Sequence, residues 1–322
     1  MSTQLDQDQP PGRPMKICLV TPSFEQGEFI ERAVRSVLTQ PREGFVLEYI
    51  VRDAQSSDRT PQILKRLQQE FPELTVRIQP DGGQASALEE EFAAADADIL
   101  GWLNADDVLL PGALPAIAGA FRRATDVVYG EAWFIDESDR IIGRYPSCNH
   151  SESHLQTICY FSQPSVFFTR AIYNHVGGIR SDLHFALDYD LWLRFARAGA
   201  RFVRLRRVLS ATRLHEATKT ASAGLAFADE IIAMQRETLG TVAEPWYLYR
   251  RFRELCESQP STSAFLCYAK ALLEYLPCSP KQFISLSGWS ARIAGRMLVC
   301  KLLTPHSEKL KRPSNPSLRQ GT

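Results

Sequence analysis

The sequence predicts an α/β protein: a mostly parallel sheet flanked by helices, with a helical extension at its C-terminal end. Two observations lead to this fold class. Short apolar runs alternate with amphipathic segments over the first 130 residues, a pattern typical of a parallel sheet that helices cover on both faces. After residue 240, three stretches have the apolar spacing of helices and no strand pattern.

The alternating elements fill the first part of the chain. Short apolar runs predict strands, and apolar residues three or four positions apart predict helices. The expected strands are 16–21, 46–51, 74–78, 98–103 and 126–130. The expected helices between them are 27–40, 60–71, 84–95 and 111–124.

The pattern changes after residue 130. The expected elements are a hairpin with its turn at 136–139, a short strand at 165–168, a helix at 187–199 and a long strand at 201–214. The chain is therefore divided into a disordered polar lead (1–15), a main domain (16–240), a helical extension (241–303) and a disordered basic tail (304–322).

The composition is that of a soluble globular protein, with 44% hydrophobic and 23% charged residues. Because 37 basic residues balance 37 acidic ones, no overall field would attract nucleic acid. Seven cysteines without a C-x-x-C pair argue against a disulfide framework or a zinc knot and indicate a reducing compartment. Without a signal-peptide pattern or an apolar run that could span a bilayer, the protein is expected to be cytoplasmic.

Polar segments follow four of the predicted strands. They are Thr21 to Ser23, Asp53 to Asp58, Asp81 to Gln84 and Asn104 to Asp107. In parallel sheets, ligands bind beyond the carboxyl ends of the strands, so these segments are expected to form one site.

Two adjacent carboxylates, Asp106 and Asp107, interrupt an apolar pattern in this region. They could cap the helix that follows. However, several carboxylates at one edge repel each other unless a cation or sugar hydroxyls lie between them. Oxygen ligands select Mg²⁺ or Mn²⁺, so a divalent cation is the alternative to capping.

Seven stretches of the chain resemble, in this order, those of family 2 glycosyltransferases, which have the GT-A fold. The resemblance runs from about residue 16 to about residue 240. It implies an inverting enzyme that moves a sugar from a nucleotide-diphosphate donor, with UDP favoured, to a hydroxyl of a glycan or lipid-linked acceptor in surface polysaccharide synthesis. The stretches are VTPSFEQGEFIERAVRSVLTQ, RDAQSSDRT, DGGQASAL, DILGWLNADDVLLPGAL, QPSVFF, LDYDLWLR and TRLHEATKT.

The resemblance assigns the donor side of the site. Asn104 and Asp106 stand where the family has its D-x-D motif, so Asp106 would hold Mn²⁺ or Mg²⁺ on the diphosphate. Asp107 and His215 are expected to complete the metal site, although a solitary histidine is equally a surface or core residue. Asp58 is interpreted as a loop cap. The other residues expected to bind the nucleotide sugar are Thr21, Pro22, Asp53, Asp81, Gln84, Arg213 and Lys219.

The acceptor side depends on Asp188, which stands where the family has its general base. Such a carboxylate takes the proton of the acceptor hydroxyl as that oxygen attacks the sugar. Without the resemblance, Asp188 would be interpreted as a partner of its helix dipole. Gln163, Ser165 and Trp192 are assigned to acceptor binding, although the helical spacing also suits Trp192 for the core.

Some positions depart from the family pattern. Leu187 replaces a glutamate before the expected base, Gly82 replaces an arginine and Glu89 replaces an asparagine. These departures leave the donor open and keep a non-catalytic nucleotide-sugar-binding module as an alternative. A sugar-phosphate nucleotidyltransferase is a weaker alternative, because the basic glycine-rich loop of that class does not follow the first strand.

The end of the chain is basic. From residue 275 onward there are eight basic residues and one acidic residue, a net charge of +7. Within it, 280–303 combines apolar residues with lysine and arginine at helical spacing. Such a helix could lie on an anionic membrane or pack on the main domain.

Overall fold

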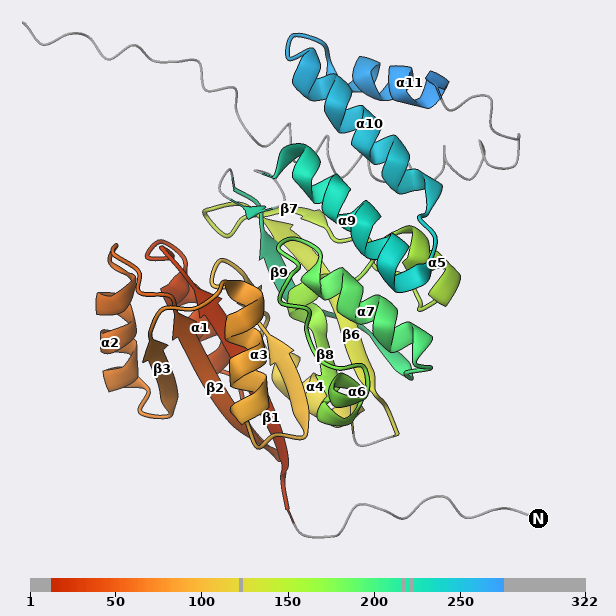
Figure 1. Cartoon of the computed structure of the whole chain (residues 1–322). Coiled ribbons are helices and arrows are strands. Elements are labelled where there is room, and N and C mark those ends of the chain that lie inside the picture. The colour runs from red at the N-terminus through yellow and green to blue at the C-terminus, as the bar shows by residue number, and fades with distance from the viewer. Residues whose placement is uncertain (1–12, 122–123, 216–217, 220–222, 275–322) are drawn as a thin grey trace, which may run out of the picture.

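The structure is a computed structural model that describes residues 13–121, 124–215, 218–219 and 223–274. Figure 1 shows a sheet with helices on both sides and a stack of three helices, α9 to α11, above it. Residues 1–12 of the expected lead 1–15, the expected helix 280–303 and the expected tail 304–322 lie outside the described residues. The end of the lead is corrected, because Met15 already belongs to β1.

A single sheet, in the order β3-β2-β1-β4-β8-β6-β9-β5 with β7 paired to β6, forms the centre of the protein. The neighbours among β1 to β4 are parallel, whereas β8 is antiparallel to both β4 and β6. The prediction of a mostly parallel sheet is confirmed, with a mixed half that the alternation did not show. The strands are β1 (Met15–Ser23), β2 (Phe45–Asp53), β3 (Leu74–Ile78), β4 (Ile99–Trp102), β5 (Val108–Leu109), β6 (Val127–Ile135), β7 (Ile141–Arg144), β8 (Val166–Thr169) and β9 (Phe202–Arg213).

Two apolar cores lie on opposite faces of the sheet, because successive strand residues point to opposite sides. Cys18 and Val20 of β1 face one core, and Ile17 and Leu19 face the other. The second core is covered by α1 (Ile30–Leu38), α2 (Thr60–Glu70) and α4 (Ala113–Ala120). The first is covered by α3 (Gln84–Ala94), α5 (Glu152–Thr157), α6 (Arg170–His175), α7 (Leu187–Arg197), α9 (Gly224–Leu239), α10 (Glu244–Ser258) and α11 (Ala264–Glu274).

The structure corrects the expected ends of three elements near the site. Residues 21–23 and Asp53 belong to β1 and β2, not to the loops that follow them. The first helix begins at Ile30 instead of residue 27. The hairpin is confirmed, since β6 and β7 pair antiparallel around the turn at 136–139.

The helices after residue 240 pack on the main domain. Trp246 and Tyr249 of α10 lie in the same core as Tyr189 of α7 and Ile231 of α9. Within the described part of the chain, no helix is both long enough and apolar enough to cross a membrane.

Candidate active site

The turn after β4, residues 104–107, is hydrogen-bonded to β9. The amide N–H of Asp107 donates to the carbonyl of Asn104 (3.1 Å), which closes the turn. Asp107 is buried, and its Oδ1 accepts the backbone N–H of Arg213 (2.8 Å). Burial, and next the charge of Asp106, raise the pKa of the Asp107 carboxyl well above its usual range.

This position corrects the expectation for Asp107. Its carboxylate is 2% exposed and bonded to the backbone of β9, so it fastens the turn and is not presented as a metal ligand. Asp106 is more open, with 17% of its side chain exposed. The turn therefore offers one carboxylate to a ligand, not two.

His215, just after β9, lies beside Asp106. Its Nε2 is 3.1 Å from Asp106 Oδ2, and its ring packs on Phe29 with the ring centroids 4.9 Å apart. Among residues 13–121, 124–215, 218–219 and 223–274, no group of three or more His, Cys, Asp or Glu side chains could hold a metal. A cation here would have Asp106 and His215 as its protein ligands.

Arg213 was expected to bind the nucleotide sugar, but its guanidinium is fully buried and already bonded. It donates to the carbonyl of Asp106 (2.8 Å), to the carbonyl of Asp136 (2.6 Å) and to Asp139 Oδ1 (2.5 Å). A buried guanidinium needs such partners because its desolvation is costly. Arg213 thus ties the turn after β4 to the β6–β7 hairpin, which corrects the expected ligand-binding role.

Three polar side chains connect α3 to the same turn. Gln84 Nε2 donates to Asn104 Oδ1 (2.8 Å), and Lys219 Nζ donates to Gln84 Oε1 (2.9 Å). Partial desolvation lowers the pKa of Lys219, while the carboxylates of Glu230 and Asp106 act in the opposite direction. These residues, all predicted for the donor side except Glu230, therefore lie together.

Thr21 and Asp53, which are expected to bind the nucleotide sugar, lie in a more enclosed group formed by β1, β2 and the loop after β2. Thr21 Oγ1 is 2.9 Å from Tyr49 Oη, and both are buried. Asp53 is also buried, and its carboxylate accepts from Ser23 Oγ (3.1 Å), Ser56 N (2.9 Å) and Ser56 Oγ (2.7 Å).

Pro22 and Asp81 are half-buried at the same edge. Asp81 Oδ1 accepts the N–H of Gly83 (2.8 Å), whose φ of 100° favours glycine at the start of α3. Asp58 Oδ1 accepts the N–H of Thr60 (2.8 Å), so its interpretation as a loop cap is confirmed.

Two of the three residues expected on the acceptor side are inside the core. Trp192 is fully buried and stacks on Trp102, with 5.5 Å between ring centroids. Ser165 is fully buried, and its Oγ donates to the carbonyls of Ser162 and Gly130. Both assignments to acceptor binding are corrected, because these side chains leave no surface for a ligand.

Gln163 is placed differently. Its Nε2 donates to the carbonyl of Trp102 at the end of β4 (2.8 Å). Its buried Oε1 has no hydrogen-bond partner in the part of the chain that the structure describes. An unpaired buried acceptor is costly, so Gln163 remains a candidate for a ligand hydroxyl.

Asp188 lies in the first turn of α7 and has little to stabilise its charge. Its Oδ1 accepts the N–H of Tyr189 (2.7 Å), and it forms no ion pair with any described residue. Burial raises the pKa of this carboxyl to about 6. A carboxylate with such a pKa can accept a proton near neutral pH.

The direction of α7 places Asp188 at the edge where the turn after β4 lies. Trp192 packs on Trp102, and Phe195, further along α7, packs on Phe168 at 5.2 Å between centroids. Phe168 is paired with Leu100, which precedes Trp102 in β4. The helix therefore runs opposite to β4, and its N-terminal turn points toward Asn104 and beyond.

Glu230 of α9, which was not among the expected site residues, lies beside this segment. Its carboxylate accepts the backbone N–H groups of His184 (3.0 Å), Phe185 (2.6 Å) and Ala186 (2.7 Å), directly before α7. No local pattern singles out this residue, because its partners are amides that are more than forty positions away in the sequence.

Residues 18–177 match the family model described as Glycosyl transferase family 2. The chain is 31% identical over 130 residues to an uncharacterized glycosyltransferase of Nostoc sp., covering 40% of each protein. It is 24% identical over 247 residues to the hyaluronan synthase of Pasteurella multocida, covering 76% of this chain and 25% of the synthase. The chain thus spans less than two thirds of the length of these relatives.

Solved structures share the fold at low sequence identity. A mannosyltransferase from Pyrobaculum calidifontis in complex with GDP-Man and Mn²⁺ has a TM-score of 0.56 at 19% identity and covers 92% of this chain and 84% of its own. S. aureus TarS in complex with UDP-GlcNAc has a TM-score of 0.59 at 18% identity and covers 84% of each chain. The similarity extends past the family match and includes the region of α7.

Proposed function

We propose, from the match of residues 18–177 to the Glycosyl transferase family 2 model, that the protein transfers a sugar from a nucleotide-diphosphate donor to a hydroxyl of a glycan acceptor. The observation that carries the proposal is the position of Asp188. Its carboxyl, whose pKa is raised to about 6, lies in the first turn of α7, and this turn is the end of the helix that lies toward the edge holding Asp106 and His215.

The proposed reaction is a single displacement. Asp188 takes the proton of the acceptor hydroxyl while that oxygen forms a bond to the anomeric carbon of the donor sugar. The bond from this carbon to the diphosphate breaks, and the nucleoside diphosphate leaves with the bonding electrons. Attack opposite the leaving group inverts the anomeric configuration. The glycan acceptor is proposed because relatives of the chain include hyaluronan and chondroitin synthases.

We propose that Asp106 and His215 hold Mn²⁺ or Mg²⁺. One carboxylate and one imidazole, 3.1 Å apart, suit a cation that completes its coordination with phosphate oxygens and water. Bound there, the cation would neutralise charge on the departing diphosphate. Lys219, beside Gln84 and within electrostatic range of Asp106, provides a second positive charge on this side.

The test is release of nucleoside diphosphate from UDP- and GDP-sugars, with Mn²⁺, in the presence and absence of glycan acceptors. Acceptor-dependent release is expected for one donor. Thermal shift with the same donors and Mn²⁺ should identify which nucleotide, UDP or GDP, the donor carries. Asp106→Ala is expected to abolish the metal-dependent shift, because the cation loses its carboxylate ligand. Release of pyrophosphate from a nucleoside triphosphate and a sugar phosphate, with no acceptor-dependent release, would contradict the proposal.

A membrane surface is proposed as a further partner through the basic segment 280–303, which lies outside the described residues. Its net positive charge and apolar positions suit anionic lipid. Flotation with anionic vesicles is expected to recover the full chain and not a chain truncated after residue 279. Equal recovery of both would show that the segment does not direct binding.

A further inference from the structure

Helix α9 is held to α7 and the residues before it by two sets of hydrogen bonds, one from Glu230 in the middle of α9 and one from Thr238 near its C-terminal end. In the first set, Glu230 accepts the three amides of residues 184–186. In the second set, the carbonyl of Thr238 accepts from Arg197 and its Oγ1 donates to Asp190 (2.8 Å). Because the order of contacts is the same along both helices, α9 runs parallel to α7.

The Glu230 contact lies next to the proposed base. Ala186 is the residue just before the first turn of α7, and Asp188 follows it by two positions. The three amides precede the helix, so helix formation alone would leave them without partners. Glu230 Oε1 takes the amides of Phe185 and Ala186, and Oε2 takes that of His184.

Glu230 also acts on the donor side. Its carboxylate is near enough to Lys219 to influence that ammonium, which bonds Gln84 and is influenced by Asp106 as well. The Glu230 carboxylate therefore accepts hydrogen bonds from the residues just before Asp188 and also attracts the ammonium of Lys219, which lies near the turn after β4. No other described residue contacts these three amides through its side chain.

We propose that Glu230 is a positioning residue for sugar transfer: it fixes the segment 184–186 so that Asp188 is held toward the acceptor hydroxyl. The inference rests on the proposed function of Asp188. Under this inference, α9, which lies beyond the residues that the family model matches, contributes to the reaction as well as to the packing of the core. Small displacements of a catalytic group can lower the rate by about a hundredfold, so such a contact has a large effect.

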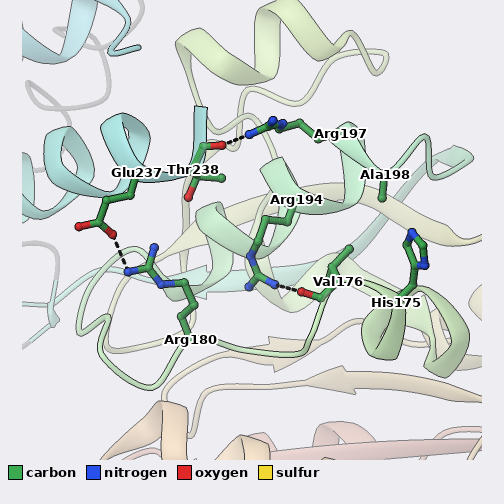
Figure 2. Close-up of a pocket in the computed structure, with 8 residues that line it drawn as sticks. All are labelled: His175, Val176, Arg180, Arg194, Arg197, Ala198, Glu237 and Thr238. Atoms are coloured by element: carbon green, nitrogen blue, oxygen red, sulfur yellow. Dashed lines mark hydrogen bonds and ion pairs between the residues drawn. The ribbon is translucent and has the colours of Figure 1, made fainter. Parts of the chain in front are cut away.

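A matched control is Glu237, which lies beside Thr238 near the C-terminal end of α9. A pocket of about 340 Å³ lies there, lined by residues of α6, α7 and α9 and of the loops that follow α6 and α7. Figure 2 shows two of its contacts, Arg180 with Glu237 (2.7 Å) and Arg197 with Thr238. Glu237 follows Glu230 by seven positions, so both lie on one face of α9, roughly 10 Å apart. Glu237→Gln removes a charge from the same helix face, and the hydrogen bonds to the amides of residues 184–186 stay in place.

The kinetic experiment compares Glu230→Ala, Glu230→Gln and Glu237→Gln in the full chain. Glu230→Ala is expected to lower kcat at least about tenfold, because the general base is misplaced. The donor KM should stay within about twofold, because Lys219 loses only a through-space attraction and keeps its hydrogen bond to Gln84. Glu230→Gln should recover part of the rate, since its oxygen can accept the two amides that Oε1 holds. Glu237→Gln should keep kcat within about twofold of wild type.

Amide hydrogen exchange tests the same inference without any turnover. Glu230→Ala is expected to speed exchange at residues 184–186, and Glu237→Gln is not. Unchanged exchange at these amides, or an equal loss of kcat in Glu237→Gln, would overturn the inference. Wild-type protein that releases no nucleoside diphosphate from any donor, with the expected exchange result, would instead count against the proposed function alone.

Discussion

The turn after β4 and the first turn of α7 form the two sides of the proposed site, and their bonding is opposite in kind. Around Asp106 the groups are densely bonded: the backbone carbonyl of Asp106 is held by Arg213, its side chain by His215, and its neighbour Asp107 by the β9 backbone. The Asp188 carboxylate accepts only from the adjacent backbone N–H groups of Tyr189 and Asp188 itself, and it forms no ion pair with any described residue.

The difference shows how one protein prepares two kinds of chemistry. A rigid, charge-compensated turn suits the binding of a phosphate-bearing donor, because its groups need not rearrange. A partly desolvated carboxyl without an ion-pair partner keeps a raised pKa, which suits a group that must take up a proton. The same contrast leads to four predictions, from the largest expected effect to the smallest.

Removing the charge of Asp188 should break the acceptor side alone. Asp188→Asn keeps the shape of the side chain but cannot take a proton, so turnover is expected to fall by about a thousandfold. Donor binding, measured by thermal shift with Mn²⁺, should stay as in wild type. The matched control is Asp182→Asn, an exposed carboxylate six positions earlier that pairs with Arg180. Turnover within a few fold of wild type in Asp188→Asn would remove it as the base.

Removing Arg213 should break the rigid side. Arg213→Met leaves the carbonyls of Asp106 and Asp136 without their donor, and we expect the free energy of unfolding to fall by about 3 kcal/mol. Arg32→Met is the control, since Arg32 bonds the same hairpin from α1 but is 34% exposed. It should cost less than about 1 kcal/mol in urea unfolding. An equal loss of unfolding free energy in the two variants would show that the buried contacts of Arg213 stabilise the turn no more than the exposed contacts of Arg32 do.

The fold was largely predictable from the sequence and the bonding within the site was not. Period-two and helical spacing follow directly from which residues are buried, so the strands and helices around the site could be predicted. The edge that gathers Gln84, Asn104 and Asp106 followed from parallel-strand topology. The burial of Asp107 and of Arg213 could not be predicted, because their partners include backbone groups of distant segments that no local pattern reveals.

The same reason explains the acceptor side. Trp192 and Ser165 lie near the expected ligand-binding segments in the sequence. In the structure both side chains are fully buried, in the part of the core next to the mixed half of the sheet. The alternation predicted parallel strands, and the antiparallel insertion of β8 between β4 and β6 was the part it could not show. Glu230 was missed because an acidic residue on an amphipathic helix has no distinguishing spacing.

The raised pKa of Asp188 makes the stability of the protein depend on pH. The pKa is about 6 in the folded state and 3.8 in its absence, so the folded state holds the extra proton between these values. Stability from this group is therefore lost as pH rises through that window. Relative to wild type, Asp188→Asn should gain about 2 to 3 kcal/mol of unfolding free energy between pH 4 and pH 8. A difference that is independent of pH would contradict the raised pKa.

Gln163 should have the smallest effect of the four. Gln163→Ala removes the buried unpaired Oε1 and the hydrogen bond to Trp102, and we expect the acceptor KM to rise about fivefold, the equivalent of one hydrogen bond. The donor KM should not change. Gln69→Ala, an exposed glutamine of α2 on the other face of the sheet, is the control and should alter neither constant. An unchanged acceptor KM in Gln163→Ala would exclude it from the acceptor side.

The most direct test of a base held ready beside a preformed donor turn is the pH dependence of kcat for acceptor-dependent release of nucleoside diphosphate. The structure predicts that kcat rises with pH through an acidic limb near pH 6, as the Asp188 carboxyl loses its proton. The limb should be missing from the residual rate of Asp188→Asn. A wild-type rate that is flat from about pH 4.5 to pH 7.5, or a limb that survives in Asp188→Asn, would contradict the account.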